Sequence, residues 1–207
     1  MHLLVTDRLA CPRCGPEFGL VLLAEELRDR RVLEGALGCA NCRERYPVRQ
    51  GFGDLRPPPR SDPGGEGGTP EGTAEEAFRL AALIGVSEGP GLILLRDGWV
   101  AQASRLAAMI EEIEIVALDQ GLRKGPEEPG VTRIVAADRL PFFSGSLRGL
   151  ALRDHEPARE LEEEIRVLGP GSRIVIRSPA PHRLERLEER GLEILLQTES
   201  LLVAARG

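Results

Sequence analysis

Two short motifs, Cys11-Pro-Arg-Cys14 and Cys39-Ala-Asn-Cys42, hold the only four cysteines of this 207-residue chain, and residues 15–38 separate them, a gap of 24. A Cys-x-x-Cys pair on one tight turn aims both sulfurs at a common point, so two such pairs can form the tetrahedral four-sulfur shell that zinc prefers. We therefore predict a structural zinc site with Cys11, Cys14, Cys39 and Cys42 as its ligands. Four sulfur ligands leave no coordination position for a substrate water, so the metal should hold the fold and do no chemistry.

The same four cysteines have two other interpretations, a pair of disulfides or a redox dithiol. A redox motif requires one Cys-x-x-Cys near a βαβ pattern, whereas this chain has two matched pairs within its first 42 residues. The spacing favours one shared ion.

The composition, with 42% hydrophobic residues, allows one sizeable core and a small satellite domain that bound zinc would stabilise. No apolar run approaches the ~20 residues of a membrane span. The opening residues 1–5 are too short for a signal peptide, and charged Asp7 and Arg8 follow them at once. Together with the paired thiols, these features predict a cytoplasmic location and no membrane partner.

The net charge of −6 is unevenly distributed. Residues 1–60 hold ten arginines and eight acids, a balance of +2, which leaves −8 for the remainder. The larger part is thus a poor candidate for nucleic-acid binding. The N-terminal part could contact RNA through arginines, namely Arg13, Arg43, Arg45 and Arg49.

Residues 1–55 are predicted to form a β-rich zinc ribbon, with short strands at residues 19–23, 32–37 and 46–48. Its segments Leu9-Ala-Cys-Pro-Arg-Cys14, Leu37-Gly-Cys-Ala-Asn-Cys42 and Tyr46-Pro-Val-Arg-Gln-Gly51 resemble the small zinc-ribbon family of methyltransferase activators. The best-known member of that family activates tRNA, ribosomal and release-factor methyltransferases as a partner subunit. The resemblance covers about a quarter of the chain and implies a protein partner, such as a methyltransferase, that binds through the ribbon.

Residues 56–72 read RPPPRSDPGGEGGTPEG, with five prolines and five glycines in 17 residues. Such a segment has no apolar side chains to bury, which is typical of a linker. We expect a hinge between the ribbon and a second domain at residues 73–207.

From Thr73 onward the pattern alternates between helix and strand. Thr73-Ala-Glu-Glu76 is a capping box that opens a helix, and Gly91-Leu-Ile-Leu-Leu95 is an apolar run typical of a parallel strand buried on both faces. The expected helices cover about residues 73–84, 99–112, 157–168 and 181–190, and the expected strands residues 91–95, 113–119, 131–138, 147–152 and 173–177. Two last strands, at residues 192–196 and 201–205, are too close in sequence for a crossover and must pair antiparallel. The fold class is therefore α/β, a Rossmann-like seven-stranded doubly wound sheet with a terminal hairpin.

This architecture resembles the class I S-adenosylmethionine methyltransferases, most closely the quinone-biosynthesis type. The likeness rests on Asp138-Arg-Leu-Pro-Phe-Phe-Ser-Gly-Ser-Leu147 after the third strand and on Arg166-Val-Leu-Gly-Pro-Gly171 before the fifth. It runs over most of residues 89–207. It implies that Asp119 would bind the cofactor ribose hydroxyls, that Asp138 and Leu140 would lie at the adenine, and that Gly98 would belong to the turn beside the methionine part.

The turn after the first strand departs from the family pattern. Where the family has several glycines, this chain reads Leu94-Leu-Arg-Asp-Gly-Trp-Val100, in which Gly98 is the only glycine. We expect Arg96 and Trp99 to bring bulk and positive charge close to a cofactor whose sulfonium is itself cationic. Only about a dozen residues separate Ser178 from the hairpin, too few for the substrate-covering segments of related enzymes.

Asp154 and His155, at the end of the fourth strand, are the candidates for catalysis, since a histidine there could act as a general base. Their alternative role is to cap the helix that Pro157 begins. The acidic run at residues 160–164 is interpreted as a solvated helix face.

The leading hypothesis is a methyltransferase-like protein that has lost ordinary catalysis and acts as a binding or regulatory module. The alternative is an active S-adenosylmethionine-dependent methyltransferase with an unusual turn, acting on a small molecule or a translation component. A third hypothesis is an accessory protein that contacts RNA through the ribbon arginines.

Overall fold

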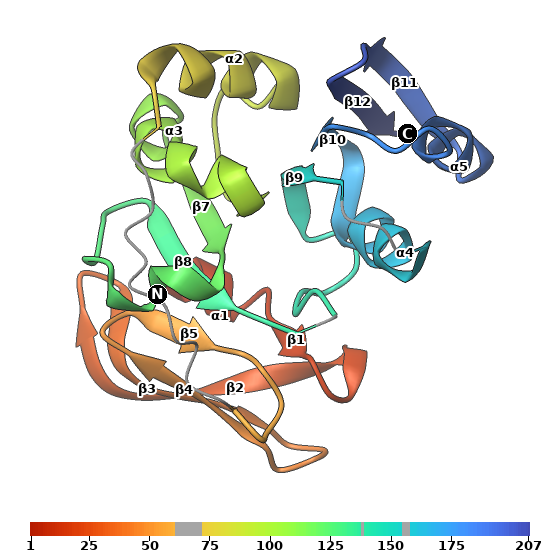
Figure 1. The fold of residues 1–207 in the computed structure, drawn as a ribbon. Coiled ribbons are helices and arrows are strands. Elements are labelled where there is room, and N and C mark those ends of the chain that lie inside the picture. Colours follow the sequence, from red (N-terminus) through yellow and green to blue (C-terminus); the bar gives the residue numbers. More distant parts are fainter. Residues whose placement is uncertain (61–71, 138, 155–157) are drawn as a thin grey trace.

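The computed structural model describes residues 1–60, 72–137, 139–154 and 158–207. Within these residues, twelve strands form one continuous sheet in the order β1-β2-β3-β4-β5-β8-β7-β6-β9-β10-β12-β11 (Figure 1). None of the described helices has the length and apolar content that a membrane span requires.

The first five strands build the ribbon. They are β1 (Ala10–Cys11), β2 (Gly15–Arg28), β3 (Arg31–Cys39), β4 (Arg45–Arg49) and β5 (Phe52–Asp54), preceded by the one-turn helix α1 (Leu3–Thr6). All neighbours among β1 to β5 pair antiparallel. The two residues Asp29 and Arg30 join β2 to β3, and both have positive φ, 46° and 62°. Positive φ at both central residues is the geometry of a tight hairpin turn, here without the glycine that usually supplies it.

The remaining seven strands follow residue 72. They are β6 (Gly91–Arg96), β7 (Ile113–Leu118), β8 (Val131–Val135), β9 (Leu147–Arg153), β10 (Leu168–Arg177), β11 (Leu192–Gln197) and β12 (Leu201–Arg206). The helical elements between or before them are α2 (Ala74–Ile84), the 3₁₀ turn η1 (Asp97–Gln102), α3 (Ala103–Met109), the 3₁₀ turn η2 (Gln120–Lys124), α4 (Ala158–Val167) and α5 (Arg183–Glu189). β8, β7, β6, β9 and β10 are parallel, and β12 runs antiparallel to both β10 and β11, as the short connection predicted.

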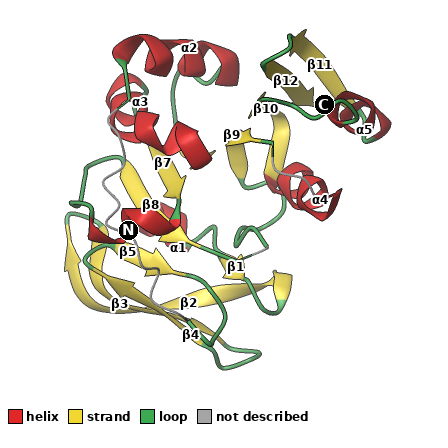
Figure 2. Cartoon of the chain, in the orientation of Figure 1, coloured by secondary structure: helices red, strands yellow, loops and turns green. Residues whose placement is uncertain are grey.

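Helices cover both faces of this part of the sheet (Figure 2), and the alternation along β6 explains why. Leu92 and Leu94 belong to one buried cluster, with residues of α4 and α5, whereas Ile93 and Leu95 belong to a second, with residues of α2, η1 and α3. Because successive side chains of a strand point to opposite faces, a strand apolar throughout must be covered on both. The predicted α/β class is confirmed.

Several element boundaries differ from the sequence prediction, among them those of β2 and β10, which are longer than the expected strands at residues 19–23 and 173–177. The helix expected over residues 99–112 opens as the 3₁₀ turn η1, and the α-helical part, α3, ends at Met109. The strand expected over residues 131–138 ends at Val135.

The ribbon is joined to the α/β part by strand pairing, so the predicted seven strands do not form a sheet of their own. β5 pairs parallel with β8, with Gly53 opposite Ile134 and Asp54 opposite Val135. A second contact is the bridge between Leu9 and Phe142. The cluster on this face includes side chains of the ribbon and of the sheet alike, among them Val5, Tyr46, Val116 and Ile134. The ribbon is thus docked on the sheet through a shared core.

Ionic contacts reinforce this junction. Arg31 of β3 forms an ion pair with Glu114 of β7 at 3.0 Å, and Thr132 donates its hydroxyl to the same carboxylate at 2.7 Å. Arg133 donates to the Gln50 carbonyl at 2.8 Å. Glu114, Thr132 and Arg133 are all buried. Since a buried charge is tolerated only with partners, these groups fix the ribbon's orientation as well as its position.

Most of the predicted linker, residues 61–71, lies outside the described residues, but both of its ends are anchored. On the ribbon side, the Arg60 guanidinium lies 5.3 Å from the Tyr46 ring centroid and donates to the Arg45 carbonyl at 3.0 Å. On the other side, the Gly72 N–H donates to the Ala101 carbonyl at 2.9 Å.

Candidate functional site

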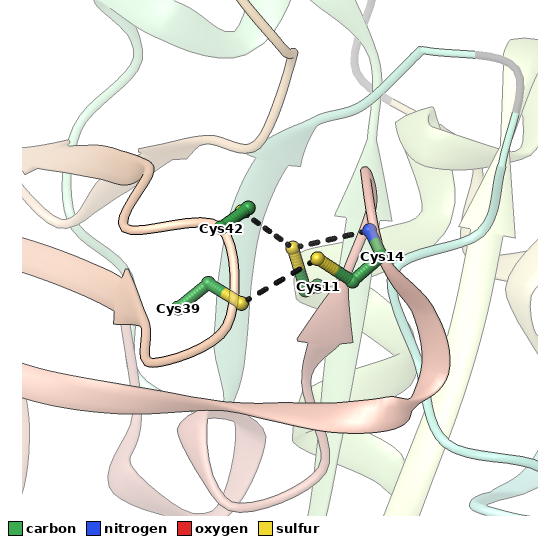
Figure 3. A group of neighbouring side chains, drawn as sticks. All are labelled: Cys11, Cys14, Cys39 and Cys42. Atoms are coloured by element: carbon green, nitrogen blue, oxygen red, sulfur yellow. Dashed lines mark hydrogen bonds between the residues drawn. The ribbon is translucent and has the colours of Figure 1, made fainter.

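The four cysteines converge at one end of the ribbon (Figure 3). Cys11 ends β1 and Cys39 ends β3, while Cys14 and Cys42 lie in the turns that follow these two strands. The Sγ atoms all lie within 4.8 Å of one another, with 3.7 Å between Cys11 and Cys42 and 3.8 Å between Cys14 and Cys39.

These distances fit a tetrahedral zinc site. Zinc–sulfur bonds of about 2.3 Å in a tetrahedron place the sulfurs about 3.8 Å apart. A disulfide requires about 2.05 Å, and all four cysteines are free. The residues therefore suit a shared metal ion, and the disulfide interpretation does not apply.

Neighbouring donors complete the surroundings of the sulfurs. The Cys14 N–H donates to the Cys11 Sγ at 3.4 Å. The Asn41 side-chain amide donates to the Cys14 Sγ at 3.3 Å. The Tyr46 hydroxyl lies 3.5 Å from Cys11 Sγ, and burial raises the pKa of Tyr46, so the hydroxyl keeps its proton and can donate. Burial, aided by the other three thiols, raises the pKa of Cys42 to about 12. Without metal that thiol is neutral, so zinc must displace its proton on binding.

The turn after β6 is the second site that the sequence singled out. Asp97 has φ of 55°, and its carboxylate accepts from the Arg153 N–H at 3.2 Å. Trp99 is buried and donates its indole N–H to the Leu152 carbonyl at 3.1 Å. The Arg177 guanidinium stacks on its ring, with the Arg177 Cζ 3.9 Å from the ring centroid. The expectation that Trp99 crowds the cofactor space needs correction, since its ring belongs to the core on the α2 and α3 face.

Arg96, in contrast, takes part in an ionic cluster at the carboxyl ends of β6 and β9. Its guanidinium lies 3.8 Å from the Glu164 carboxylate of α4, and Glu164 also pairs with Arg183 of α5. Arg183 in turn lies 3.7 Å from Asp154, which follows β9. Glu164 and Arg183 are only 1% and 2% exposed. Among the described residues, two acids and two arginines thus form one ionic network around the buried Glu164 and Arg183, which we call the Arg96 cluster.

Within this cluster, the Asp154 carboxylate makes contacts that hold parts of the fold together. Besides Arg183, the Asp154 carboxylate accepts from the Ala180 N–H at 2.8 Å, which ties the end of β9 to the segment after β10. Its neighbour His155 lies outside the described residues, as does the predicted helix start at Pro157. The catalytic assignment of Asp154 and His155 stays a prediction.

The predicted cofactor contacts follow the ends of neighbouring strands. Asp119 follows β7 and caps η2, since its carboxylate accepts from the Gly121 N–H at 2.6 Å. Leu140, in the loop after β8, is buried in the core, and its N–H donates to Glu163 of α4 at 3.2 Å. Gly98 has no neighbour closer than 4.0 Å to an added Cβ and no positive φ, so its position does not demand glycine. Asp138 lies outside the described residues.

Sequence reasoning missed the two buried members of the Arg96 cluster, Glu164 and Arg183. The acidic run at residues 160–164 was interpreted as a solvated face, which is wrong for Glu164. A signal was present, because Glu164 stands three residues after Leu161, the residue expected to face inward, and positions three apart share a helix face.

The structure is thus an α/β sheet extended by a ribbon that carries four clustered cysteines. The ribbon can be assigned further: residues 2–51 match the family model described as "Trm112p-like protein". The predicted resemblance of the ribbon is confirmed. A search of curated proteins found no match.

Several methyltransferases are among the solved structures that are similar to this chain. Geranyl diphosphate methyltransferase, solved with GPP and sinefungin, has a TM-score of 0.52 and 13% identity over 65% of this chain and 79% of that one. A SAM-dependent methyltransferase from Aquifex aeolicus has a TM-score of 0.48 and 16% identity, covering 63% of this chain and 88% of that one. The tRNA (m1A58) methyltransferase TrmI from the same organism has a TM-score of 0.48 and 16% identity, covering 69% and 72%. The likeness to geranyl diphosphate methyltransferase, at 13% identity, shows the fold alone.

Proposed function

We propose that this protein is a catalytically degenerate methyltransferase-like module that binds or regulates, with its zinc ribbon docked on its own sheet. The observation that carries the proposal is the Arg96 cluster. In an α/β sheet of this kind, ligands bind at the carboxyl ends of the strands, and the turn after the first strand must let a cofactor approach the backbone closely. Here that turn starts with a long cationic side chain that is committed to Glu164.

Electrostatics argues in the same direction. A sulfonium cofactor bound at this turn would place a second positive charge near Arg96. Moving Arg96 away would take one of the two guanidinium groups from the buried Glu164 carboxylate, which costs free energy because a buried charge depends on its partners. The connection between β10 and β11 holds only the short helix α5 within residues 178–191, which supports the expected lack of a lid.

For the metal, we propose one structural zinc ion held by Cys11, Cys14, Cys39 and Cys42. The convergence of four sulfurs at tetrahedral spacing supports it. With all four coordination positions taken by sulfur, the ion would link the ends of β1 and β3. This link would stabilise the face of the ribbon that docks on the sheet.

For the partner, we propose that the ribbon acts within its own chain. The family's best-known member supplies its ribbon as a separate subunit, whereas here β5 already pairs with β8 of the same chain. A further protein partner would then contact a surface other than this pairing edge.

Calorimetry with S-adenosylmethionine tests the proposed loss of cofactor binding. We expect no binding heat from the zinc-loaded wild type. The informative variant is Asp119→Ala, which removes the carboxylate that the family resemblance assigns to the ribose. Micromolar binding by the wild type that disappears in Asp119→Ala would make the protein an ordinary cofactor binder and end the proposal.

A further inference from the structure

A hollow of about 420 Å³ lies where the ribbon meets the α/β part. Four arginines line it: Arg49 at the end of β4, Arg56 and Arg60 after β5, and Arg123 on η2. Phe52 and Pro47 supply its apolar wall. Its volume is in the range of small-molecule sites, and its basic lining contrasts with the net charge of −6 of the whole chain.

Two of the arginines are held in place before any ligand arrives. Arg56 makes a two-pronged pair with Asp54, at 2.9 and 2.6 Å. Arg60 donates to the Arg56 carbonyl at 2.7 Å and to the Glu44 carboxylate at 3.3 Å. Because these side chains are already ordered, a ligand would lose little of its binding free energy in fixing them.

Arginines outnumber acids among the described residues that line the hollow. Four of these residues are arginines and one, Asp54, is an acid, and Glu44 pairs with Arg60 from outside the lining. Among the described residues, the guanidinium of Arg49 has no carboxylate partner. Like charges held together repel, so an anion of two or more charges would stabilise the group.

The hollow also lies at the edge of the sheet where α/β proteins bind ligands. Asp54 ends β5, which runs parallel to β8, and Arg123 belongs to the turn that follows the carboxyl end of β7. Ligands of open α/β sheets bind outside these carboxyl ends. The ribbon therefore adds its arginines to an edge that belongs to the α/β part.

We propose that this hollow is a binding site for a phosphate group. The planar guanidinium fork matches phosphate oxygens, and charge-assisted hydrogen bonds of this kind are the strong ones. A phosphate dianion or a diphosphate can accept from several of these guanidinium groups at once, for which a single carboxylate has too few oxygens. The site is distinct from the Arg96 cluster and does not depend on whether S-adenosylmethionine binds.

The test is a calorimetric titration of the zinc-loaded full chain at low ionic strength, with inorganic pyrophosphate in one arm and a short single-stranded RNA in the other. We expect Arg49→Ala and Arg123→Ala each to weaken binding at least about tenfold, the scale of one lost charge-assisted contact. The matched control is Arg28→Ala, which removes the same charge from an exposed arginine at the far end of β2. It should leave the affinity within about twofold, the scale of one exposed ion pair.

The two arms separate the possible sources of the phosphate. Arginine-dependent binding of pyrophosphate supports the site and identifies a small phosphorylated ligand. Arginine-dependent binding of RNA alone supports it with a polynucleotide backbone as the source. The proposal is overturned if neither probe binds, or if Arg28→Ala weakens binding as much as Arg49→Ala, because that would indicate general attraction to the ribbon. Retained zinc in each variant confirms that it is folded.

Discussion

Phe142→Ala tests whether the ribbon and the α/β part share one core. Phe142 is fully buried, forms the bridge with Leu9, and belongs to the cluster that contains both Tyr46 of the ribbon and Val116 of the sheet. Truncating a buried phenylalanine to alanine costs about 3–5 kcal/mol of unfolding free energy. With an unfolding entropy of about 2.1 cal/mol/K per residue, 207 residues give about 0.4 kcal/mol/K, so the melting temperature should fall by roughly 7–12 °C.

The assay follows two signals in one thermal unfolding experiment. Circular dichroism reports the sheet and helices, and a chromophoric chelator reports zinc release from the ribbon. In a shared core both signals should move together to the lower temperature, although Phe142 lies far from the cysteines in the sequence. The control is Phe78→Ala, the same chemical change at a side chain that is 68% exposed, which should move neither signal.

Independent domains would give a different result. If zinc release in Phe142→Ala keeps its wild-type temperature while the circular dichroism signal shifts, the ribbon unfolds by itself and the shared core is refuted.

Three further predictions concern the metal, the half-buried carboxylate of Asp54 and the Arg96 cluster. Cys39→Ser should abolish stoichiometric zinc in elemental analysis and unfold the ribbon; a variant that keeps both would contradict the four-sulfur site. Burial alone would raise the pKa of Asp54, but the hydrogen bonds from Arg56 outweigh burial and hold that pKa below its usual value. Ionised Asp54 therefore stabilises the fold above about pH 4. This stabilisation is lost as the pH falls through the pKa of Asp54 in the folded protein. Urea unfolding of Asp54→Asn between about pH 5 and pH 3 should therefore depend less on pH than that of the wild type, and equal slopes would contradict this assignment. Arg183→Ala should lower the unfolding free energy by about 3 kcal/mol, the low end for a buried pair, because it removes the guanidinium shared by Glu164 and Asp154 while Arg96 stays near Glu164. Arg190→Ala, at an exposed pair, should cost less than about 1 kcal/mol, and equal effects in urea unfolding would refute the buried pairing.

Local signals in the sequence were sufficient for most elements of the α/β part. The capping box predicted that Thr73 begins a helix, and its side chain does accept from the Glu76 N–H at 3.2 Å. The apolar run at residues 91–95 predicted a strand buried on both faces, and β6 is one. Such features are decided by residues within a few positions of one another.

The docking of the ribbon could not be predicted from the sequence in the same way. β5 is three residues long, contains Gly53 and has no periodic pattern. It pairs with its neighbour β4 on one side, but the pairing that docks the ribbon is with β8, about 80 residues away. The burial of Glu164 has the same origin, since its partners Arg96 and Arg183 come from other elements. Contacts between distant segments, unlike caps and alternation, leave no local pattern.

The indole N–H resonance of Trp99 gives the most direct test of the central claim, that the turn after β6 no longer serves an S-adenosylmethionine site. Trp99 is the only tryptophan in the chain, and its indole donates from this turn to the Leu152 carbonyl. A titration of zinc-loaded protein, with ¹⁵N in tryptophan, should leave the position of this single resonance unchanged as S-adenosylmethionine is added. A saturable shift of that resonance would place the cofactor at the turn and contradict the account.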